Sequence, residues 1–221
     1  GSEMCIRDRR DCDGTEMPDA LLNEPVKKYA TYYTTRKDNA WAEQNPEEIQ
    51  QEYLISNRVT ARSEKLCIRL MEGFHTQQLK VNTLDDPKRW WEVIDRTTGE
   101  VVSVDDWEFK KELEEVEIKT IPYHEYTVSF LAFLIWDPVH MYNFITNDWK
   151  DTPHQLTYDV RQPKTQKYVK EKLKRWCEEN PQIDVVRFTT FFHQFTLTFD
   201  DKKREKFVEW FGYSASVSPY I

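Results

Sequence analysis

The last hundred residues alternate between strand-like and helix-like patterns, and this alternation constrains the fold most. Tyr126–Trp136 is an almost continuous apolar run, typical of a strand that is buried on both faces of a sheet. Pro163–Glu179 follows with apolar residues on one helical face, and Val185–Phe192 is a second apolar run. Asp200–Phe211 has a helical apolar face again. The order strand, helix, strand, helix predicts βαβ units around a parallel sheet.

Residues from about 39 to 122 have a different pattern, which indicates an antiparallel insertion. Val116–Ile121 alternates between apolar and polar residues, as a half-solvated strand does. Trp90–Arg96 and Glu100–Val104 flank a Thr-Thr-Gly sequence, which predicts a hairpin with Gly99 in its loop. We therefore expect a β-rich insertion at about 39–122.

One more strand–helix unit is expected before this insertion. A strand should end near Arg10, with Gly14 in the turn, and Asp19–Arg36 has apolar residues at helical spacing. Together with the units that begin at Tyr126 and Val185, this makes about three. A complete (β/α)8 barrel takes ~250 residues. The predicted fold class is therefore α/β: a partial (β/α)8 TIM barrel, with about the first three strand–helix units and an antiparallel β excursion.

Composition excludes several classes of function. Asp and Glu outnumber Lys and Arg by 39 to 31, giving a net charge of −8, so a general nucleic-acid binder with a basic face is not expected. The apolar runs fall short of the ~20 residues that a membrane helix needs. The four cysteines are scattered without a CxxC pair, so neither a zinc site nor a disulfide framework is predicted. These features favour a cytoplasmic protein with reduced thiols, no membrane and no metal.

Polar residues at the predicted strand ends are the candidate ligand-binding groups. In α/β folds, ligands bind beyond the carboxyl ends of parallel strands. Arg10, the segment 137–147 and Arg187 fall at such ends, and Arg187 is a cation within a run that reads as a buried strand. Two arginine side chains at one site suit a phosphate or a hydroxyl-rich sugar, since guanidinium groups bind such oxygens in pairs. For each arginine alone, the alternative is a salt bridge within the fold.

Aromatic and acidic residues at the same ends are further candidates. The aromatic side chains that could stack on a sugar are Trp136, Trp149 and Tyr213. For each of them, packing in the core is the favoured alternative. The carboxylates that could act as an acid by position are Asp13, Asp137 and Asp148. His124 and His193 are possible bases, but none of these groups has a distinguishing sequence context.

Strings along nearly the whole chain resemble one enzyme family. They are Arg9–Thr15, Trp91–Val102, His124–Ala132, Trp136–Val139, Met141–Asn143, Thr146–Trp149, Asp184–Phe192 and Trp210–Gly212. From Arg10 to Pro219 the chain resembles the 1,3-β-galactosyl-N-acetylhexosamine phosphorylases, also called lacto-N-biose or galacto-N-biose phosphorylases. Relatives within this family act on galactosyl-β-1,4-rhamnose.

The resemblance implies a TIM-barrel catalytic domain, of which residues 1–221 would be the amino-terminal part. It implies inverting phosphorolysis of a β-galactoside to α-galactose 1-phosphate and a free acceptor sugar. The expected partners are the disaccharide and inorganic phosphate, with no cofactor, and the full-length protein is expected to be a cytoplasmic homodimer. Because phosphate is the nucleophile, one acid suffices where hydrolases use two carboxylates.

The resemblance also implies roles for particular residues. Arg10, Asn143 and Arg187 correspond to substrate-binding residues, and Pro138 and Tyr213 to residues on the acceptor side. The family's aspartate acid is expected beyond Ile221, so the fragment is expected to be inactive by itself. The alternatives are a non-catalytic sugar-binding module and an interaction protein that uses an open sheet edge.

Overall fold

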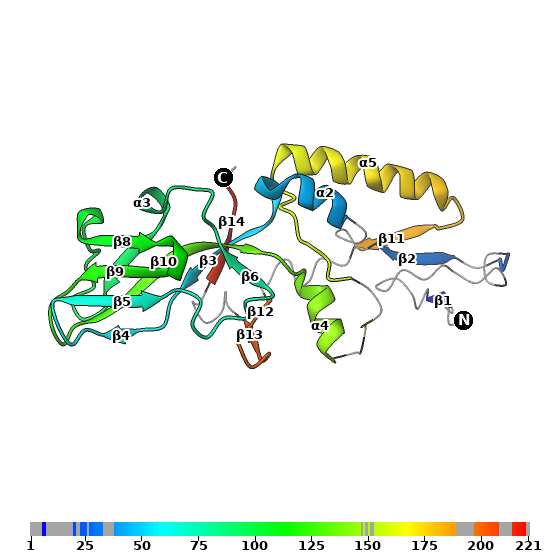
Figure 1. The fold of residues 1–221 in the computed structure, drawn as a ribbon. Coiled ribbons are helices and arrows are strands. Elements are labelled where there is room, and N and C mark those ends of the chain that lie inside the picture. The colour runs from blue at the N-terminus through cyan, green and yellow to red at the C-terminus, as the bar shows by residue number, and fades with distance from the viewer. Residues whose placement is uncertain are drawn as a thin grey trace.

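The structure is a computed structural model that describes residues 6–7, 20, 23–25, 27–32, 38–146, 148, 150, 153–188, 197–207 and 214–219. Figure 1 shows an elongated arrangement, with antiparallel strands at one end and the helices α2 (Asn39–Gln44) and α5 (Pro163–Glu179) towards the other. Within the described ranges, no helix has the length and apolar character needed to cross a membrane.

A small parallel sheet lies beneath α5. Its strands are β1 (Ile6–Arg7), β2 (Lys28–Tyr32) and β11 (Val185–Phe188), in the order β1-β2-β11. Both pairings are parallel. The ring of Tyr32 packs edge-on against Trp176 of α5 at 5.4 Å, so the helix covers one face of the sheet. The predicted bounds of α5 are confirmed, and so is the parallel pairing of residues 185–188.

Two expectations about this sheet are wrong. Residues 28–32, which were expected to lie within a helix, form β2, because pairing with strands on both sides overrides helical spacing. The run from Val185 was expected to be buried, yet Val185 is 39% and Phe188 48% exposed. In this sheet β2 is the central strand and β11 is an edge strand, so β11 lacks a second neighbour among the described strands.

The longest strand, β10 (Glu125–Leu134), is buried along nearly its whole length. It pairs with β3 (Gln51–Ile55) on one side and with β7 (Glu92–Asp95) and β6 (Leu79–Val81) on the other, all antiparallel. The expected burial on both faces is confirmed, but the expected place in a parallel sheet is wrong. An apolar run indicates that a strand is buried, but it does not indicate whether the neighbouring strands are parallel or antiparallel to it.

Two shorter strands complete this sheet. They are β4 (Val59–Thr60), which pairs with the start of β10, and β14 (Ser214–Val217), which pairs with β3. The antiparallel part therefore extends beyond the predicted insertion at 39–122, because it also contains β10 and β14.

A second antiparallel sheet packs against the first. Its order is β5 (Lys65–Arg69), β9 (Glu115–Lys119), β8 (Trp107–Lys110). The alternation predicted around Val116 is confirmed, because Val116 and Ile118 are fully buried while their neighbours are not. The core between the sheets includes Leu54, Ile68 and Phe130, each at most 1% exposed. The short helical turns are η1 (Pro46–Glu48), α3 (Pro87–Trp90), η2 (Val104–Asp106) and η3 (Lys111–Leu113).

Two predicted local elements have different outcomes. The hairpin is confirmed: Ile94 bridges Val101, and Gly99 adopts a φ of +81° in the loop. The helix expected over 200–211 is wrong where it is described, because β12 (Leu197–Phe199) and β13 (Glu205–Phe207) form a hairpin. Asp200 stabilises the hairpin turn by accepting the amides of Lys202 and Arg204 at 3.0 and 2.8 Å. Residues 208–211 lie outside the described residues.

The architecture is mixed α/β, with sheets that stay open. The parallel pairings involve β1, β2 and β11, and these three strands do not close into a barrel. A partial barrel over residues 1–221, with an insertion at about 39–122, therefore stays a prediction.

Candidate functional site

The structure describes three of the five predicted substrate-binding residues. Pro138 and Asn143 lie on α4 (Pro138–Thr146), which begins just after β10. Arg187 is the third residue of β11, in register with Thr31 of β2, and its side chain is exposed. Arg10 and Tyr213 lie outside the described residues. The convergence of these five residues on one ligand stays a prediction.

Helix α4 is fixed at its start by a buried carboxylate. Asp137 is fully buried, and its Oδ1 accepts the backbone N–H of His140 at 2.9 Å, which is the geometry of an N-cap. The backbone N–H of Asp137 donates to the carbonyl of Gln155 at 2.6 Å. Pro138 occupies the first helical position, where a missing N–H costs nothing. Asp137, a candidate acid by position, is thus engaged in holding the helix.

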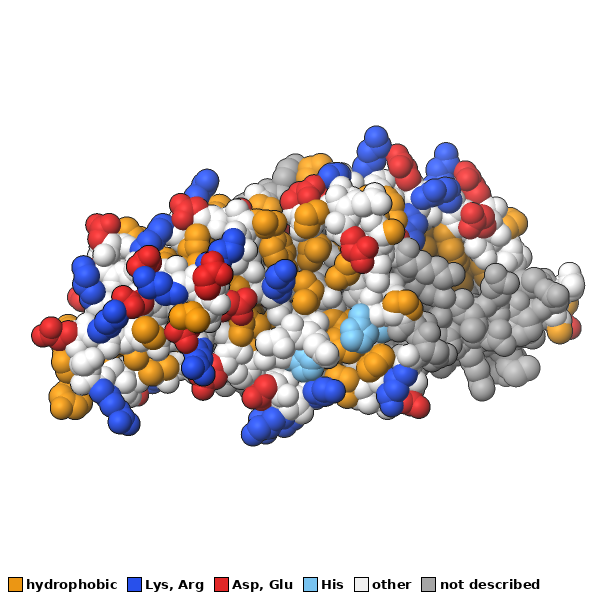
Figure 2. All heavy atoms as spheres, in the orientation of Figure 1, with side chains coloured by type: hydrophobic (Ala, Val, Ile, Leu, Met, Phe, Trp, Pro, Cys, Tyr) orange, Lys and Arg blue, Asp and Glu red, His pale blue; other side chains and the backbone are white. Residues whose placement is uncertain are grey.

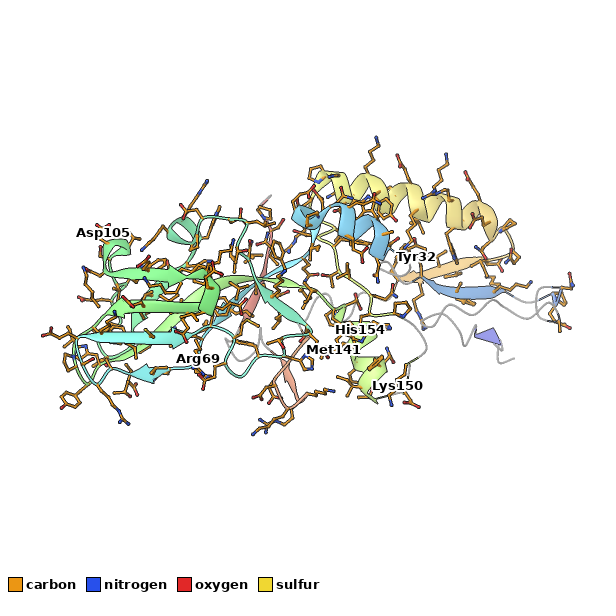
Figure 3. All side chains as sticks on the ribbon, viewed as in Figure 1. Tyr32, Arg69, Asp105, Met141, Lys150 and His154 are labelled. Atoms are coloured by element: carbon orange, nitrogen blue, oxygen red, sulfur yellow. The ribbon has the colours of Figure 1, made fainter. Side chains whose placement is uncertain are left out.

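Trp136 is a buried member of an aromatic cluster rather than an open platform. The indole is 2% exposed, and its Nε1–H donates to Nδ1 of His140 at 2.8 Å. The imidazole of His154 stacks on the indole, with ring centres 3.5 Å apart and planes at 14°. Phe144 meets it edge-on at 5.2 Å. Figure 3 shows His154 beside α4, close to Met141 of that helix. The core-packing alternative for Trp136 is confirmed.

The other candidates that are described lie elsewhere. Asp148 is exposed and forms an ion pair with Lys150. Nδ1 of His124 lies 2.7 Å from Oδ2 of the buried Asp95, at the hairpin of the antiparallel part. Burial alone would raise the pKa of Asp95, but hydrogen bonds from His124 and from two backbone amides together lower it. Asp13, Trp149 and His193 lie outside the described residues.

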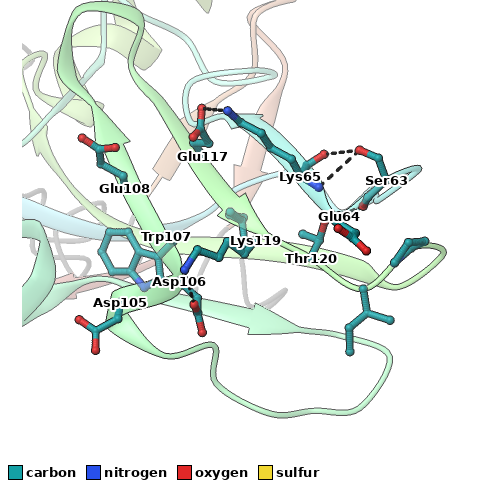
Figure 4. A pocket seen from close by; sticks show the side chains of 13 residues that line it. Ser63, Glu64, Lys65, Asp105, Asp106, Trp107, Glu108, Glu117, Lys119 and Thr120 are labelled. Atoms are coloured by element: carbon teal, nitrogen blue, oxygen red, sulfur yellow. Dashed lines mark hydrogen bonds and ion pairs between the residues drawn. The ribbon is translucent and has the colours of Figure 1, made fainter.

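A groove of about 1310 Å³ lies on the second antiparallel sheet (Figure 4). Its carboxylates are largely paired with lysines, as in Lys65–Glu117 and Lys119–Asp106, each at 2.9 Å. Figure 2 shows acidic and basic side chains intermingled over this end of the molecule. The groove contains none of the predicted site residues. Among the described residues, no group of three or more His, Cys, Asp or Glu side chains is arranged to hold a metal ion.

Sequence reasoning missed the histidines around Trp136. His75, His140 and His154 come from a loop, from α4 and from the segment that leads to α5, so their proximity depends on the fold. The available signal was the position of Trp136, just before the N-cap Asp137, relative to His140 in the first turn of the helix that follows.

Comparisons with known proteins give the chain a family. The family described as "Lacto-N-biose phosphorylase N-terminal TIM barrel domain" matches residues 6–221. A 1,3-beta-galactosyl-N-acetylhexosamine phosphorylase of Lachnoclostridium phytofermentans is 67% identical over 214 residues, which are 96% of this chain and 30% of that protein. Another, from Bifidobacterium longum, is 48% identical over 211 residues, 95% of this chain and 28% of that protein.

A more distant relative has a different name. The D-galactosyl-beta-1->4-L-rhamnose phosphorylase of Lachnoclostridium phytofermentans is 38% identical over 214 residues, 96% of this chain and 30% of that protein. The chain therefore spans about 30% of the length of the curated relatives that it matches. A match across residues 6–221 means that the chain belongs to the lacto-N-biose phosphorylase family, within the region described as its N-terminal TIM barrel domain.

Proposed function

We propose that the protein catalyses the inverting phosphorolysis of a galactosyl-β-1,3-N-acetylhexosamine. The observation that carries this proposal is the match of almost the entire chain to relatives with that named activity. The N-acetylhexosamine phosphorylases are 67% and 48% identical to the chain, while the rhamnose enzyme is 38% identical. This difference supports an N-acetylhexosamine as the acceptor sugar.

The proposed reaction needs one acid and one nucleophile. An oxygen of inorganic phosphate attacks the anomeric carbon of galactose from the face opposite the leaving group. The bond from that carbon to the acceptor oxygen breaks, and the acid gives its proton to this oxygen. The products are α-galactose 1-phosphate and the free acceptor sugar. Phosphate thus replaces the second carboxylate that a glycoside hydrolase uses to activate water.

Arg187 is proposed to bind the galactoside and the phosphate together with Arg10 and Asn143. Its support in the structure is its place near the carboxyl end of a parallel strand, where α/β folds bind ligands. Its exposed guanidinium can donate paired hydrogen bonds to phosphate or sugar oxygens. Pro138 and Tyr213 are proposed to line the acceptor side.

The general acid is proposed to come from an aspartate outside these 221 residues, so the chain alone should not turn over substrate. The sheet β1-β2-β11 with α5 would then be the first part of the barrel. We also propose a cytoplasmic homodimer for the whole protein. Cys67 and Cys177 are exposed free thiols, which supports a reducing compartment.

The test is a chimera in which this chain replaces the matching 214 residues of the Lachnoclostridium phytofermentans relative. Incubated with galactosyl-β-1,3-N-acetylglucosamine and phosphate, the chimera should release α-galactose 1-phosphate, detected by ³¹P NMR. The chain alone should release none. Free galactose as the product, or sugar binding by a folded chimera without turnover, would reject phosphorolysis in favour of hydrolysis or of a binding module.

A further inference from the structure

We propose that Trp136, His140 and His154 form a pH-sensitive latch that fixes helix α4, with His140 as a positioning residue for the substrate groups on that helix. The functional part rests on the proposed function, because Pro138 and Asn143 lie on α4. The latch itself rests on the geometry of the cluster.

The latch joins three separate parts of the chain. Trp136 follows β10, His140 is on the first turn of α4, and His154 belongs to the segment that leads to α5. That segment is anchored further, because the carbonyl of His154 accepts the side-chain amide of Asn39 at 2.6 Å. The backbone N–H of Leu156 donates to the same Asn39 side chain at 2.8 Å. The stack of His154 on Trp136 therefore connects the start of α4 to α2, because Asn39 of α2 holds the segment that contains His154.

The hydrogen bond from Trp136 depends on the protonation state of His140. An indole N–H can only donate, so Nδ1 of His140 must accept with a lone pair. The neutral ring then carries its proton on Nε2. Protonation at Nδ1 would place two N–H donors 2.8 Å apart, and the hydrogen bond would be lost.

The surroundings of His140 keep it neutral. Burial is the main cause that lowers the pKa of His140; Asp137 raises it and His154 lowers it. His154 is exposed overall, but one face of its ring is shielded from water by Trp136, which lowers the pKa of His154, and His75 adds to the effect. Among the described residues, His75 is in turn influenced by Lys203, which lowers its pKa, and by Asp200, which raises it; both are on the turn between β12 and β13.

The sign of the pH effect follows from these lowered values. A histidine with a lowered pKa in the fold binds fewer protons than in the opened state, so the closed latch is favoured at higher pH. The stabilisation starts to fall as the pH drops through about 6.5, the ordinary value for histidine, and is lost below the lowered value. The latch is thus closed at neutral pH and opens in mild acid.

Conservative substitutions can distinguish the effect of the Trp136–His140 hydrogen bond from the effect of side-chain packing. His140→Asn keeps a side-chain oxygen that can accept near the position of Nδ1, but it does not titrate. Trp136→Phe keeps an aromatic ring and removes the N–H donor. His124→Asn is the matched control, because His124 is a histidine paired with a carboxylate in the antiparallel part.

The experiment measures hydrogen exchange of the α4 amides on the 221-residue chain from about pH 7.5 to about pH 5, corrected for intrinsic exchange. Protection should fall by up to about tenfold per pH unit in the wild type and in His124→Asn, the limit for one coupled proton. It should fall less steeply in His140→Asn, in which His154 still titrates, and it should start low in Trp136→Phe. An unchanged acid step in His140→Asn, or no step in the wild type, would overturn the latch.

Two further readouts keep the structural and functional parts distinct. Long-range ¹H–¹⁵N spectra of the wild type should show an unprotonated Nδ1 for His140 at neutral pH, and a protonated Nδ1 would overturn the hydrogen bond. In the chimera, KM for the galactoside should rise more in acid for the wild type than for His140→Asn. Equal pH profiles would reject the positioning role. Absence of turnover at every pH would reject the proposed function, and the exchange and NMR results would still decide the latch.

Discussion

Removal of the carboxylate of Asp38 should destabilise the fold far more than removal of any surface acid. Asp38 is 2% exposed and lies just before α2. It accepts hydrogen bonds from the hydroxyls of Tyr158 at 2.9 Å and Tyr168 at 2.7 Å, and it forms an ion pair with Lys172. Tyr168 and Lys172 are on α5, so Asp38 holds the helix that leads into β11 and Arg187.

The expected cost follows from what Asp38→Ala leaves behind. The side chain of Lys172 is 19% exposed, and Tyr158 is 2% exposed, so water reaches neither freely. Burial is the main cause that raises the pKa of the Tyr158 hydroxyl, so it cannot ionise to compensate. Removing one partner of a buried ion pair costs about 3–5 kcal/mol. With a urea m-value near 3 kcal/mol/M, the unfolding midpoint should fall by roughly 1–2 M.

Urea unfolding followed by circular dichroism measures this change. Glu47→Ala is the matched control, since Glu47 also pairs with a lysine of α5, Lys164, but both side chains are more than half exposed. Such a pair is worth at most about 1 kcal/mol. Asp38→Asn keeps an acceptor but no charge, so it should lie between the two. If Asp38→Ala costs no more than Glu47→Ala, the buried clamp does not exist in solution and the docking of α5 inferred from it is wrong.

Three further predictions concern the antiparallel part. Leu54→Ala removes a fully buried side chain from the core and should lower the free energy of unfolding by about 2–5 kcal/mol, measured by urea unfolding. Gly99→Ala places a side chain at a φ of +81° with no atom within 4 Å, so backbone strain alone should cost about 1 kcal/mol. Because the pKa of Asp95 is lowered, its stabilisation is present above about pH 4 and is lost below it. The decrease of stability in acid should therefore be shallower in Asp95→Asn, and an equal decrease would contradict the assigned hydrogen bonds.

Local patterns predicted local elements, while partners in space were harder to predict. The bounds of α5 followed from Pro163 at its start and its amphipathic face, and the alternation around Val116 predicted β9. The strand β10 was recognised as buried on both faces, but its neighbours could not be predicted, since an apolar run fits a parallel or an antiparallel centre equally well. The hairpin at 197–207 was missed because the turn depends on a single side chain, Asp200.

In the candidate site too, some residues could be predicted from the sequence, while their contacts in space could not. Asn143 was predicted as a substrate-binding residue from the family strings, and Arg187 from these strings and from its place at a predicted strand end, which corresponds to β11. The contacts of Trp136 could not, because His75 and His154 reach it from segments about sixty and eighteen residues away in the chain. Contacts of this kind are set by tertiary packing, which a single sequence does not encode locally.

The central claim is that this chain supplies the arginine that binds the galactoside and phosphate in a phosphorylase. Its most direct test is the kcat/KM for phosphate of the chimera with Arg187→Ala, against Lys174→Ala as a control on the exposed face of α5. Loss of a charged hydrogen-bonding pair at the site should lower kcat/KM by about 10²-fold or more, with the fold retained by circular dichroism. Arg187→Lys should restore it in part, because lysine keeps the charge without the paired donors. A folded Arg187→Ala chimera with the wild-type kcat/KM would contradict the account.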